Sequence, residues 1–311
     1  MSHNSVGVLV MSYGTPASLD DVKTYYTHIR RGVPPTQEQL AALVSRYDSI
    51  AGGCFPLRKN TDEQAAALQL TLDREYSFSE YVCFQGLKHA PPFIEEGVEQ
   101  IAAAGIRKAV GIVLAPHYSA LSVGAYIERA RKKAKELHLD MRFVKSYHDH
   151  HLLIQALATR VRRGLDRFPL ADHPQVRVIF TDHSLPASIL ERGDPYPEQL
   201  MQTSCLVAKM SGVTNWQFAW QSAGRTDVPW LGPDILDVLE TVCRQERVKN
   251  VLICPVGFVS DHLEVLYDID IECRQLAESF GMQLERTEML NADPAYMKLL
   301  AEVVHRAAEE G

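Results

Sequence analysis

Residues 8–16 read VLVMSYGTP, an aliphatic run that ends in polar residues and a proline. Residues 178–186 read VIFTDHSLP and repeat this pattern, so that Tyr13 in the first stretch falls on His183 in the second. Each stretch has the pattern of a buried strand followed by a proline that opens the next helix. A repeat of this kind indicates two related units in one chain.

A second pair of stretches supports the repeat. KAVGIVLAP (108–116) and KNVLICPV (249–256) are apolar runs in which a proline precedes a long helical segment. Around them, short β-branched or aliphatic runs alternate with amphipathic segments along the whole chain. These runs predict strands at residues 6–11, 81–85, 109–115, 141–147, 176–181, 216–220, 251–256 and 283–288.

Continuous apolar strands separated by helices are typical of parallel sheets covered on both faces. The pattern therefore predicts an α/β fold with two Rossmann-like domains, each a four-stranded parallel sheet flanked by helices. We place the first domain at residues 1–148 and the second at residues 149–311, which end in a closing helix. Because open α/β sheets bind ligands at the carboxyl ends of their strands, we expect an active-site cleft between the domains, with Tyr13 and His183 on opposite walls.

The composition is that of a soluble globular protein, with 46% hydrophobic and 23% charged residues. A net charge of −7 argues against a nucleic-acid partner, which would need a basic face. The sequence has neither an apolar run long enough to span a membrane nor the basic start of a signal peptide. Its six cysteines form no C-x-x-C pair. We expect a reduced, cytoplasmic protein.

Several common catalytic motifs are absent from the sequence. It contains no G-x-G-x-x-G, no G-x-x-x-x-G-K-[ST], no H-E-x-x-H and no G-x-S-x-G. An ordinary dehydrogenase, kinase, metalloprotease or hydrolase therefore has little support.

Residues 257–272, GFVSDHLEVLYDIDIE, place five carboxylates and a histidine directly after an apolar strand. Glu264, Asp268 and Glu272 are spaced four residues apart, so on a helix they share one face. Like charges at that spacing repel each other by a few tenths of a kcal/mol per pair. A hard divalent cation would offset this repulsion. A solvated helix face is the alternative interpretation.

His183 ends a predicted buried strand and is a candidate for proton transfer or metal binding, because imidazole titrates near neutral pH. A structural histidine is the alternative. His117 occupies a comparable strand end and is a weaker candidate. His148, His150 and His151 are interpreted as part of a solvated loop.

Residues 22–60 carry six basic side chains against two acidic ones, a local balance of +4 in an acidic chain. The segment also contains Tyr25, Tyr26 and Tyr47. Arginine forks bind carboxylates and aromatic rings pack on flat apolar faces, which predicts a planar ligand with carboxylates at its rim. An exposed helical insertion is the alternative.

An ordered set of motifs resembles the ferrochelatases, specifically the short soluble Gram-positive type: LVMSYGTP, YYTHIRRG, GLKHAPPF, VLAPHYSALS, DHSLP, GDPYPEQL, WQSAGRTDVPWLGPD and PVGFVSDHLEVLYDIDIEC. The resemblance runs from about Val6 to the C-terminal helix. It implies an enzyme of haem biosynthesis that inserts Fe(II) into a porphyrin. For this type, the implied substrate is coproporphyrin III and the product is Fe-coproporphyrin III, or coproheme. The four propionates of that porphyrin fit the basic segment.

The resemblance also implies roles for individual residues. His183 and Glu264 would face each other on the metal-insertion side as catalytic and metal-binding groups. Asp268 and Glu272 match a row that can hold a second hydrated cation such as Mg²⁺. The residues implied to bind the porphyrin are Tyr13, axial to the metal, and Arg30, Arg46, Tyr47 and Tyr126.

The resemblance implies no permanently bound cofactor. The chain stops at Gly311, without the extension that carries cluster cysteines and a dimer contact in animal relatives, so we expect a monomer without an iron–sulfur cluster. Transient haem-pathway partners are expected. One departure concerns residues 52–57, GGCFPL, where relatives commonly have G-G-x-S-P-L. Phe55 in place of the serine would remove a propionate hydrogen bond, a loss of about 1 kcal/mol.

Three other functions remain open. A ferrochelatase acting on protoporphyrin IX is the first alternative. A chelatase for another tetrapyrrole or metal would not need Tyr13, Arg30 and Arg46. A non-catalytic carrier of porphyrin or haem would not need Glu264, Asp268 and Glu272, so this row favours catalysis.

Overall fold

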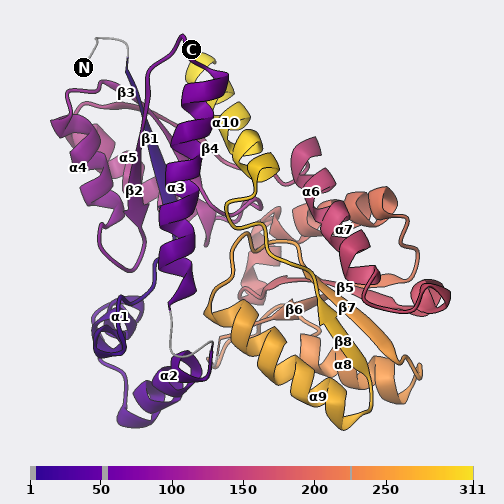
Figure 1. Ribbon diagram of the computed structural model, residues 1–311. Helices are drawn as coiled ribbons and strands as arrows, with labels where there is room; N and C mark the ends of the chain where they lie inside the picture. The colour runs from indigo at the N-terminus through magenta and orange to yellow at the C-terminus, as the bar shows by residue number, and fades with distance from the viewer. Residues whose placement is uncertain (1–4, 51–54, 225, 311) are drawn as a thin grey trace. The chain divides into compact units, whose positions relative to one another are not determined.

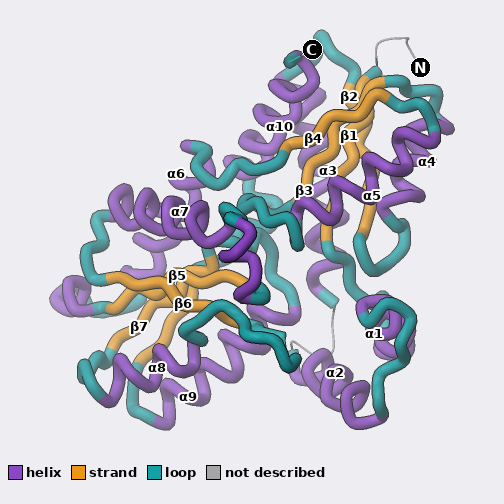
Figure 2. The backbone as a smooth tube through the Cα atoms, turned by 180° about the vertical axis from the view of Figure 1, so that it is seen from behind, coloured by secondary structure: helices purple, strands orange, loops and turns teal. Residues whose placement is uncertain are grey.

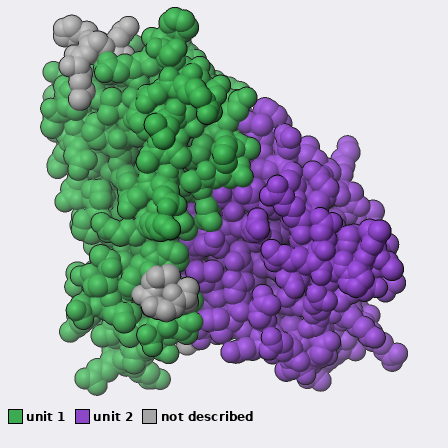
Figure 3. Space-filling model, in the orientation of Figure 1, with its two compact units in different colours: residues 1–147, 291–311 green, residues 148–290 purple. Residues whose placement is uncertain are grey.

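The computed structural model describes residues 5–50, 55–224 and 226–310. They form two compact units, residues 1–147 with 291–311 and residues 148–290 (Figure 3). Both units are α/β (Figure 1). The predicted cleft between the domains stays a prediction.

Each unit contains one four-stranded parallel sheet, and every predicted strand is present. The first sheet has the order β2-β1-β3-β4, with β1 (Val6–Ser12), β2 (Tyr81–Leu87), β3 (Lys108–Val113) and β4 (Asp140–Val144). The second has the order β6-β5-β7-β8, with β5 (Arg177–His183), β6 (Trp216–Gln221), β7 (Asn250–Pro255) and β8 (Gln283–Arg286). The two sheets have the same order, and β1 corresponds to β5 as the sequence repeat predicts.

Helices cover both faces of each sheet (Figures 1 and 2). The helices of the first unit are α1 (Val22–Ile29), α2 (Gln37–Ser49), α3 (Pro56–Glu75), α4 (Ile94–Ala103), α5 (Val123–Glu136) and α10 (Pro294–Glu309). Of these, α3, α4, α5 and α10 pack on the sheet, whereas α1 and α2 pack on each other. Those of the second unit are α6 (His151–Leu165), α7 (Tyr196–Ser211), α8 (Ile235–Arg244) and α9 (Arg274–Ser279), with a π-helical segment at Val265–Cys273. Short 3₁₀ turns lie at Leu19–Asp21, Leu170–Gln175 and Ala187–Arg192.

Alternation along the central strands explains why both faces are covered. In β1, Leu9 and Met11 pack in the apolar cluster with α4 and α5, whereas Val8 and Val10 point to the other face; all four are fully buried. The corresponding strand β5 directs Ile179 toward α8 and the π-helical segment. A strand that buries both of its faces reads as a continuous apolar run, which is the signal that predicted it.

The closing helix α10 belongs to the first unit, so its predicted place in the second domain was wrong. It packs on α3, β3 and β4. The hydroxyl of Tyr296 on α10 lies 2.9 Å from that of Tyr147, which donates to the Val113 carbonyl over 3.1 Å. An amphipathic pattern predicts that one face of a helix is buried, but it does not specify the sheet that buries it.

No helix in the described ranges combines the length and the apolar composition needed to cross a membrane. The described cysteines Cys83, Cys205, Cys243, Cys254 and Cys273 are free thiols. Cys54 lies outside the described residues, as do Gly52 and Gly53 of the divergent GGCFPL stretch.

Candidate functional site

His183 and Glu264 lie close together in the second unit. His183 is the last residue of β5, and Glu264 directly precedes the π-helical segment. His183 Nε2 lies 3.6 Å from Glu264 Oε1, and about a third of each side chain is exposed (31% and 34%). His183 Nδ1 bonds to the Ser184 carbonyl, which can only accept, so Nδ1 carries the proton of a neutral ring. Nε2 is then a proton acceptor that faces the carboxylate.

A second histidine, which the sequence analysis did not assign, holds the other oxygen of Glu264. His262 Nε2 lies 3.5 Å from Glu264 Oε2, and His262 Nδ1 donates to the Ser260 carbonyl over 2.9 Å. Burial lowers the pKa of His262, but the hydrogen bond and charge of Glu264 raise it by more, so the pKa lies above its usual value. A protonated His262 in turn stabilises an ionised Glu264. The spacing H-x-E was the available sequence signal.

A buried carboxyl group lies directly behind His183. Asp182 is 4% exposed, and the Tyr196 hydroxyl lies 2.8 Å from Asp182 Oδ2 and 2.9 Å from the His183 carbonyl oxygen. Burial raises the pKa of Asp182 to about 6, although the hydrogen bond with Tyr196 opposes this. The phenol has one hydrogen and faces two acceptors. A protonated Asp182 satisfies the network, because it donates to Tyr196, which donates to His183.

Gly257 is the residue that makes room for this carboxyl group. A Cβ atom at position 257 would lie 1.7 Å from Asp182 Oδ2 and 2.0 Å from its Cγ. No side chain fits there while Asp182 keeps its place, so glycine is required by close approach rather than by backbone angle. Neither Asp182, Tyr196 nor Gly257 was singled out from the sequence, because their contact joins distant segments.

The acidic row continues from Glu264 along the π-helical segment. Asp268 is 7% exposed and accepts a hydrogen bond from the Ser222 hydroxyl, and Glu272 is half-buried. All five carboxylates of residues 257–272 are buried or half-buried, so the solvated-face interpretation is wrong. The i→i+5 hydrogen bonds of a π-helix widen its turn, and such segments occur frequently at functional sites.

In the first unit, the rings of Tyr13 and Tyr126 both lie close to the ammonium group of one lysine. Tyr13 follows β1 and is 41% exposed. Lys88 Nζ, just after β2, lies 5.8 Å from the centre of the Tyr13 ring and 4.9 Å from that of Tyr126. Burial, and then repulsion from neighbouring arginines, lowers the pKa of Lys88. Within the described residues no carboxylate pairs with this ammonium group, which makes it a candidate binding group for an anion.

A histidine pair adjoins Tyr13. The His89 ring lies 4.6 Å from the Tyr13 ring, and His89 Nδ1 lies 3.0 Å from His28 Nδ1. Burial and then the charge of Lys88 lower the pKa of His89 to about 3, so this ring is neutral at physiological pH. Lys88 and His89 belong to the quoted GLKHAPPF motif, but their chemistry was not recognised from the sequence.

The arginines lie on the helical insertion, and Tyr47 is placed differently from the expectation. Arg30 follows α1 with its guanidinium 5.7 Å from the Tyr26 ring centre, and Arg46 lies half-buried on α2. Tyr47 is only 3% exposed: its hydroxyl lies 3.2 Å from Thr15 Oγ1 and its ring packs against Phe55 at 4.7 Å. Phe55, the residue that departs from the usual serine, thus covers Tyr47.

Tyr126 and the remaining histidines are also placed by the structure. Tyr126 is 5% exposed and offers its ring to Lys88 rather than to solvent. His117 is buried at 2% exposure. His148 bonds to Gln202 at 3.0 Å, while His150 caps α6 and stacks on His151, so this cluster is only partly the solvated loop that the sequence predicted.

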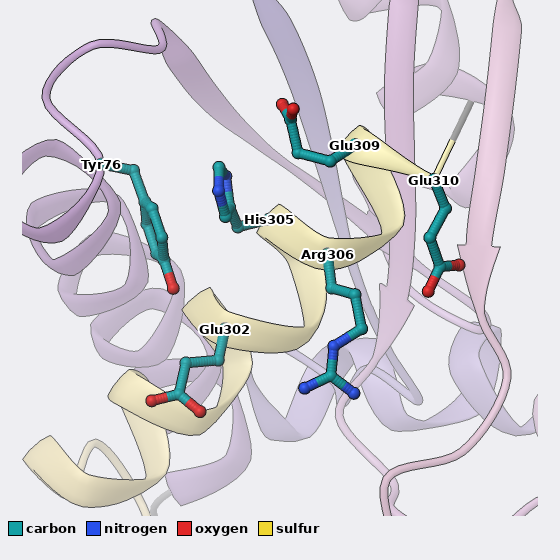
Figure 4. Close-up of a pocket in the computed structure, with 6 residues that line it drawn as sticks. All are labelled: Tyr76, Glu302, His305, Arg306, Glu309 and Glu310. Atoms are coloured by element: carbon teal, nitrogen blue, oxygen red, sulfur yellow. The ribbon is translucent and has the colours of Figure 1, made fainter.

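A separate pocket of about 420 Å³ lies in the first unit, lined by Tyr76, Glu302, His305, Arg306, Glu309 and Glu310 (Figure 4). His305 stacks on Tyr76 at 3.9 Å, and its Nδ1 lies 2.7 Å from the Tyr81 hydroxyl. Because Tyr81 begins β2, this pocket lies at the amino edge of the sheet. Tyr13 and Lys88 lie at the opposite edge, and the pocket contains no predicted site residue.

The sequence is similar to proteins of a known family over almost its whole length. The family model for ferrochelatase matches residues 5–308. A coproporphyrin III ferrochelatase from Halalkalibacterium halodurans is 43% identical over 311 residues, covering 100% of this chain and 99% of that protein. One from Geobacillus thermodenitrificans is 44% identical over 313 residues, with the same coverage.

Solved structures agree on the fold. SirB from Bacillus subtilis with Fe³⁺ superposes with a TM-score of 0.63 at 13% identity, covering 98% of this chain and 96% of that chain. The sirohydrochlorin chelatase SirB from Bacillus subtilis subspecies spizizenii, in complex with cobalt, gives 0.59 at 14% identity with the same coverage. At this identity the likeness concerns the fold alone. The family match and the full-length relatives together show that the chain belongs to the ferrochelatase family.

Proposed function

We propose that this protein inserts Fe(II) into coproporphyrin III and releases Fe-coproporphyrin III. The observation that carries the proposal is the pair His183 and Glu264, with Nε2 and Oε1 separated by 3.6 Å and both side chains accessible. Relatives that are 43% and 44% identical over their full length, named coproporphyrin III ferrochelatase, support the choice of porphyrin.

The pair suits the proton chemistry of insertion. A free-base porphyrin carries two pyrrole N–H groups, and both protons must leave when Fe(II) enters. Nε2 of a neutral His183 can accept one proton, and Glu264 offers a second acceptor. His262 holds the other oxygen of Glu264 and so orients this carboxylate, and the Ser184 carbonyl fixes the tautomer of His183.

The acidic row suits the delivery of the metal ion. Fe(II) arrives hydrated and must exchange water for other ligands. Glu264, Asp268 and Glu272 would replace hydration water stepwise, since carboxylate oxygens bind divalent cations. The same row is proposed to accept a second cation such as Mg²⁺. The monomeric state, the cytoplasmic location, the haem-pathway partners and the absence of an iron–sulfur cluster stay predictions.

The first unit suits the porphyrin itself. Tyr13 presents an exposed ring at a strand end, and Lys88, Arg30 and Arg46 bring positive charge to the same unit. Carboxylates pair with such groups, and coproporphyrin III has four of them. A porphyrin with more carboxylates therefore gains more from these residues than protoporphyrin IX does.

Lys88→Met is expected to raise the dissociation constant for coproporphyrin III by roughly tenfold or more, because a hydrogen bond to a charged group contributes about 1.5–3 kcal/mol. Porphyrin absorbance titration measures this constant. Lys133→Met on α5 is the matched control, since Lys133 Nζ already pairs with Glu99 at 2.7 Å. Equal affinities for the two variants would contradict a role of Lys88 in anion binding.

The test of function is anaerobic insertion of Fe(II) into coproporphyrin III and protoporphyrin IX, followed by the loss of the free-base absorption bands. Faster turnover of coproporphyrin III supports the proposal. Faster turnover of protoporphyrin IX would support ferrochelatase activity but contradict coproporphyrin III as the preferred substrate. Tight porphyrin binding without insertion would indicate a non-catalytic porphyrin carrier and contradict the proposed enzyme.

A further inference from the structure

One arginine binds two of the five carboxylates in residues 257–272. Arg286, the last residue of β8, donates from Nε and Nη2 to the two oxygens of Asp270, both over 2.8 Å. Its Nη2 also donates to Asp261 Oδ1 over 3.2 Å, and Nη1 donates to the Thr287 carbonyl over 3.0 Å. The side chain is 13% exposed, so these bonds are largely shielded from water.

The two bound carboxylates flank the residues proposed to handle the metal. Asp261 lies three positions before Glu264 and adjoins His262, in the loop after β7. Asp270 lies in the π-helical segment, midway between Asp268 and Glu272. A single guanidinium therefore ties the loop and the helical segment to the same strand of the sheet.

The charges explain why such a clamp is needed. Five carboxylates within twelve residues repel one another, and burial strengthens that repulsion because the local dielectric is low. Burial lowers the pKa of Arg286, but Asp270 and Asp261 raise it by more, so the group stays a cation. Arg286 thereby neutralises Asp270, which lies between Asp268 and Glu272, and Asp261, which precedes Glu264. The other three carboxylates meet different groups, among them His183 and His262 at Glu264 and Ser222 at Asp268.

We propose that Arg286 is a positioning residue that sets the spacing of Glu264, Asp268 and Glu272 for the incoming metal ion. This inference rests on the proposed function for its role in iron insertion. A lysine could supply the charge but not the planar fork that binds both oxygens of Asp270. Residues that orient metal-binding groups typically change metal affinity or activity by about 10- to 100-fold when they are replaced.

Arg177 offers a matched control in the same unit. It begins β5, its side chain is 16% exposed, and its Nη2 lies 2.6 Å from Glu246 Oε2. Its Nε donates to Asn215 over 2.6 Å, so it ties surface segments together as Arg286 does. It lies at the amino end of β5, whereas His183 lies at the carboxyl end. A purely structural role of Arg286 would make the two arginines equivalent.

The experiment compares Arg286→Lys with Arg177→Lys. We expect Arg286→Lys to raise the KM for Fe(II) about tenfold and to leave the KM for coproporphyrin III unchanged. The Kd for Co²⁺, titrated into the porphyrin-free protein, should rise by the same factor. Arg177→Lys should leave all three constants unchanged. An unchanged KM for Fe(II) and Kd for Co²⁺ in Arg286→Lys, or equal changes for both substrates, would overturn the proposal.

Two further measurements keep the outcomes separate. Asp270→Asn replaces a bidentate acceptor with a single carbonyl oxygen and should reproduce the same split if Arg286→Lys does not fold. The Co²⁺ titration does not require turnover. A wild-type protein that binds Co²⁺ but inserts no iron would contradict the proposed function, while a weaker Co²⁺ affinity in the Arg286 variant would still support the clamp.

Discussion

His183→Ala is expected to lower the rate of iron insertion by about 10²- to 10⁴-fold, the range that general acid–base groups contribute. The variant removes the Nε2 atom that lies 3.6 Å from Glu264 and that is proposed to accept a pyrrole proton, while His262 keeps its place at the other oxygen of Glu264. The effect should fall on kcat, because the role proposed for His183 concerns the metal and the protons rather than the propionates. Porphyrin affinity should remain close to that of the wild type.

Stopped-flow absorbance of single-turnover insertion under anaerobic conditions measures the rate directly. His173→Ala is the control: this histidine bonds to the Phe168 carbonyl at 3.2 Å and precedes β5 at the amino edge of the sheet. Glu264→Gln should also be slow, since the amide keeps the shape but not the charge that His183 and His262 face. A His183→Ala variant that inserts iron at the wild-type rate would remove the pair from the mechanism.

Most of the fold could be predicted from the sequence, because buried parallel strands are continuous apolar runs. The repeat of VLVMSYGTP in VIFTDHSLP predicted that β1 and β5 are equivalent, and the two strand orders confirm it. The segment 265–273 was treated as an ordinary helix, because residues four apart share a face in both α- and π-helices. The place of α10 depended on which sheet its apolar face meets, and only packing specifies that.

The residues of the candidate site could be predicted only where reactive side chains come soon after a predicted strand. His183 and Glu264 could be singled out because each follows an apolar run. The groups that support them come from distant segments: Arg286 reaches Asp270 from β8, and the Asp182 carboxyl lies against Gly257. The burial of individual side chains could not be predicted from the sequence either. Tyr47 was expected to bind the porphyrin, whereas in the structure it is buried and its ring packs against Phe55.

Asp182→Asn is expected to stabilise the protein at neutral and alkaline pH. Burial raises the pKa of Asp182 from 3.8 to about 6 in the folded state, so the folded protein holds this proton more tightly than the unfolded chain does. The stabilisation from the bound proton is complete below the unfolded value. It is lost as the pH rises through about 6, where the buried carboxyl must ionise. A shift of about two pKa units corresponds to roughly 3 kcal/mol.

Asparagine has the size of the carboxyl group but does not titrate, so the variant lacks this pH dependence. The free energies of unfolding of the two proteins, from denaturant titrations, should differ by about 2 kcal/mol more at pH 8 than at about pH 4.5. Asp166→Asn, at an exposed position after α6, is the control and should show no such change with pH. A constant difference for Asp182→Asn would mean that the carboxyl is ionised in the folded protein throughout this range. The Tyr196 phenol, with one hydrogen and two acceptors, argues for the protonated acid in the part of this range that lies below the pKa of about 6.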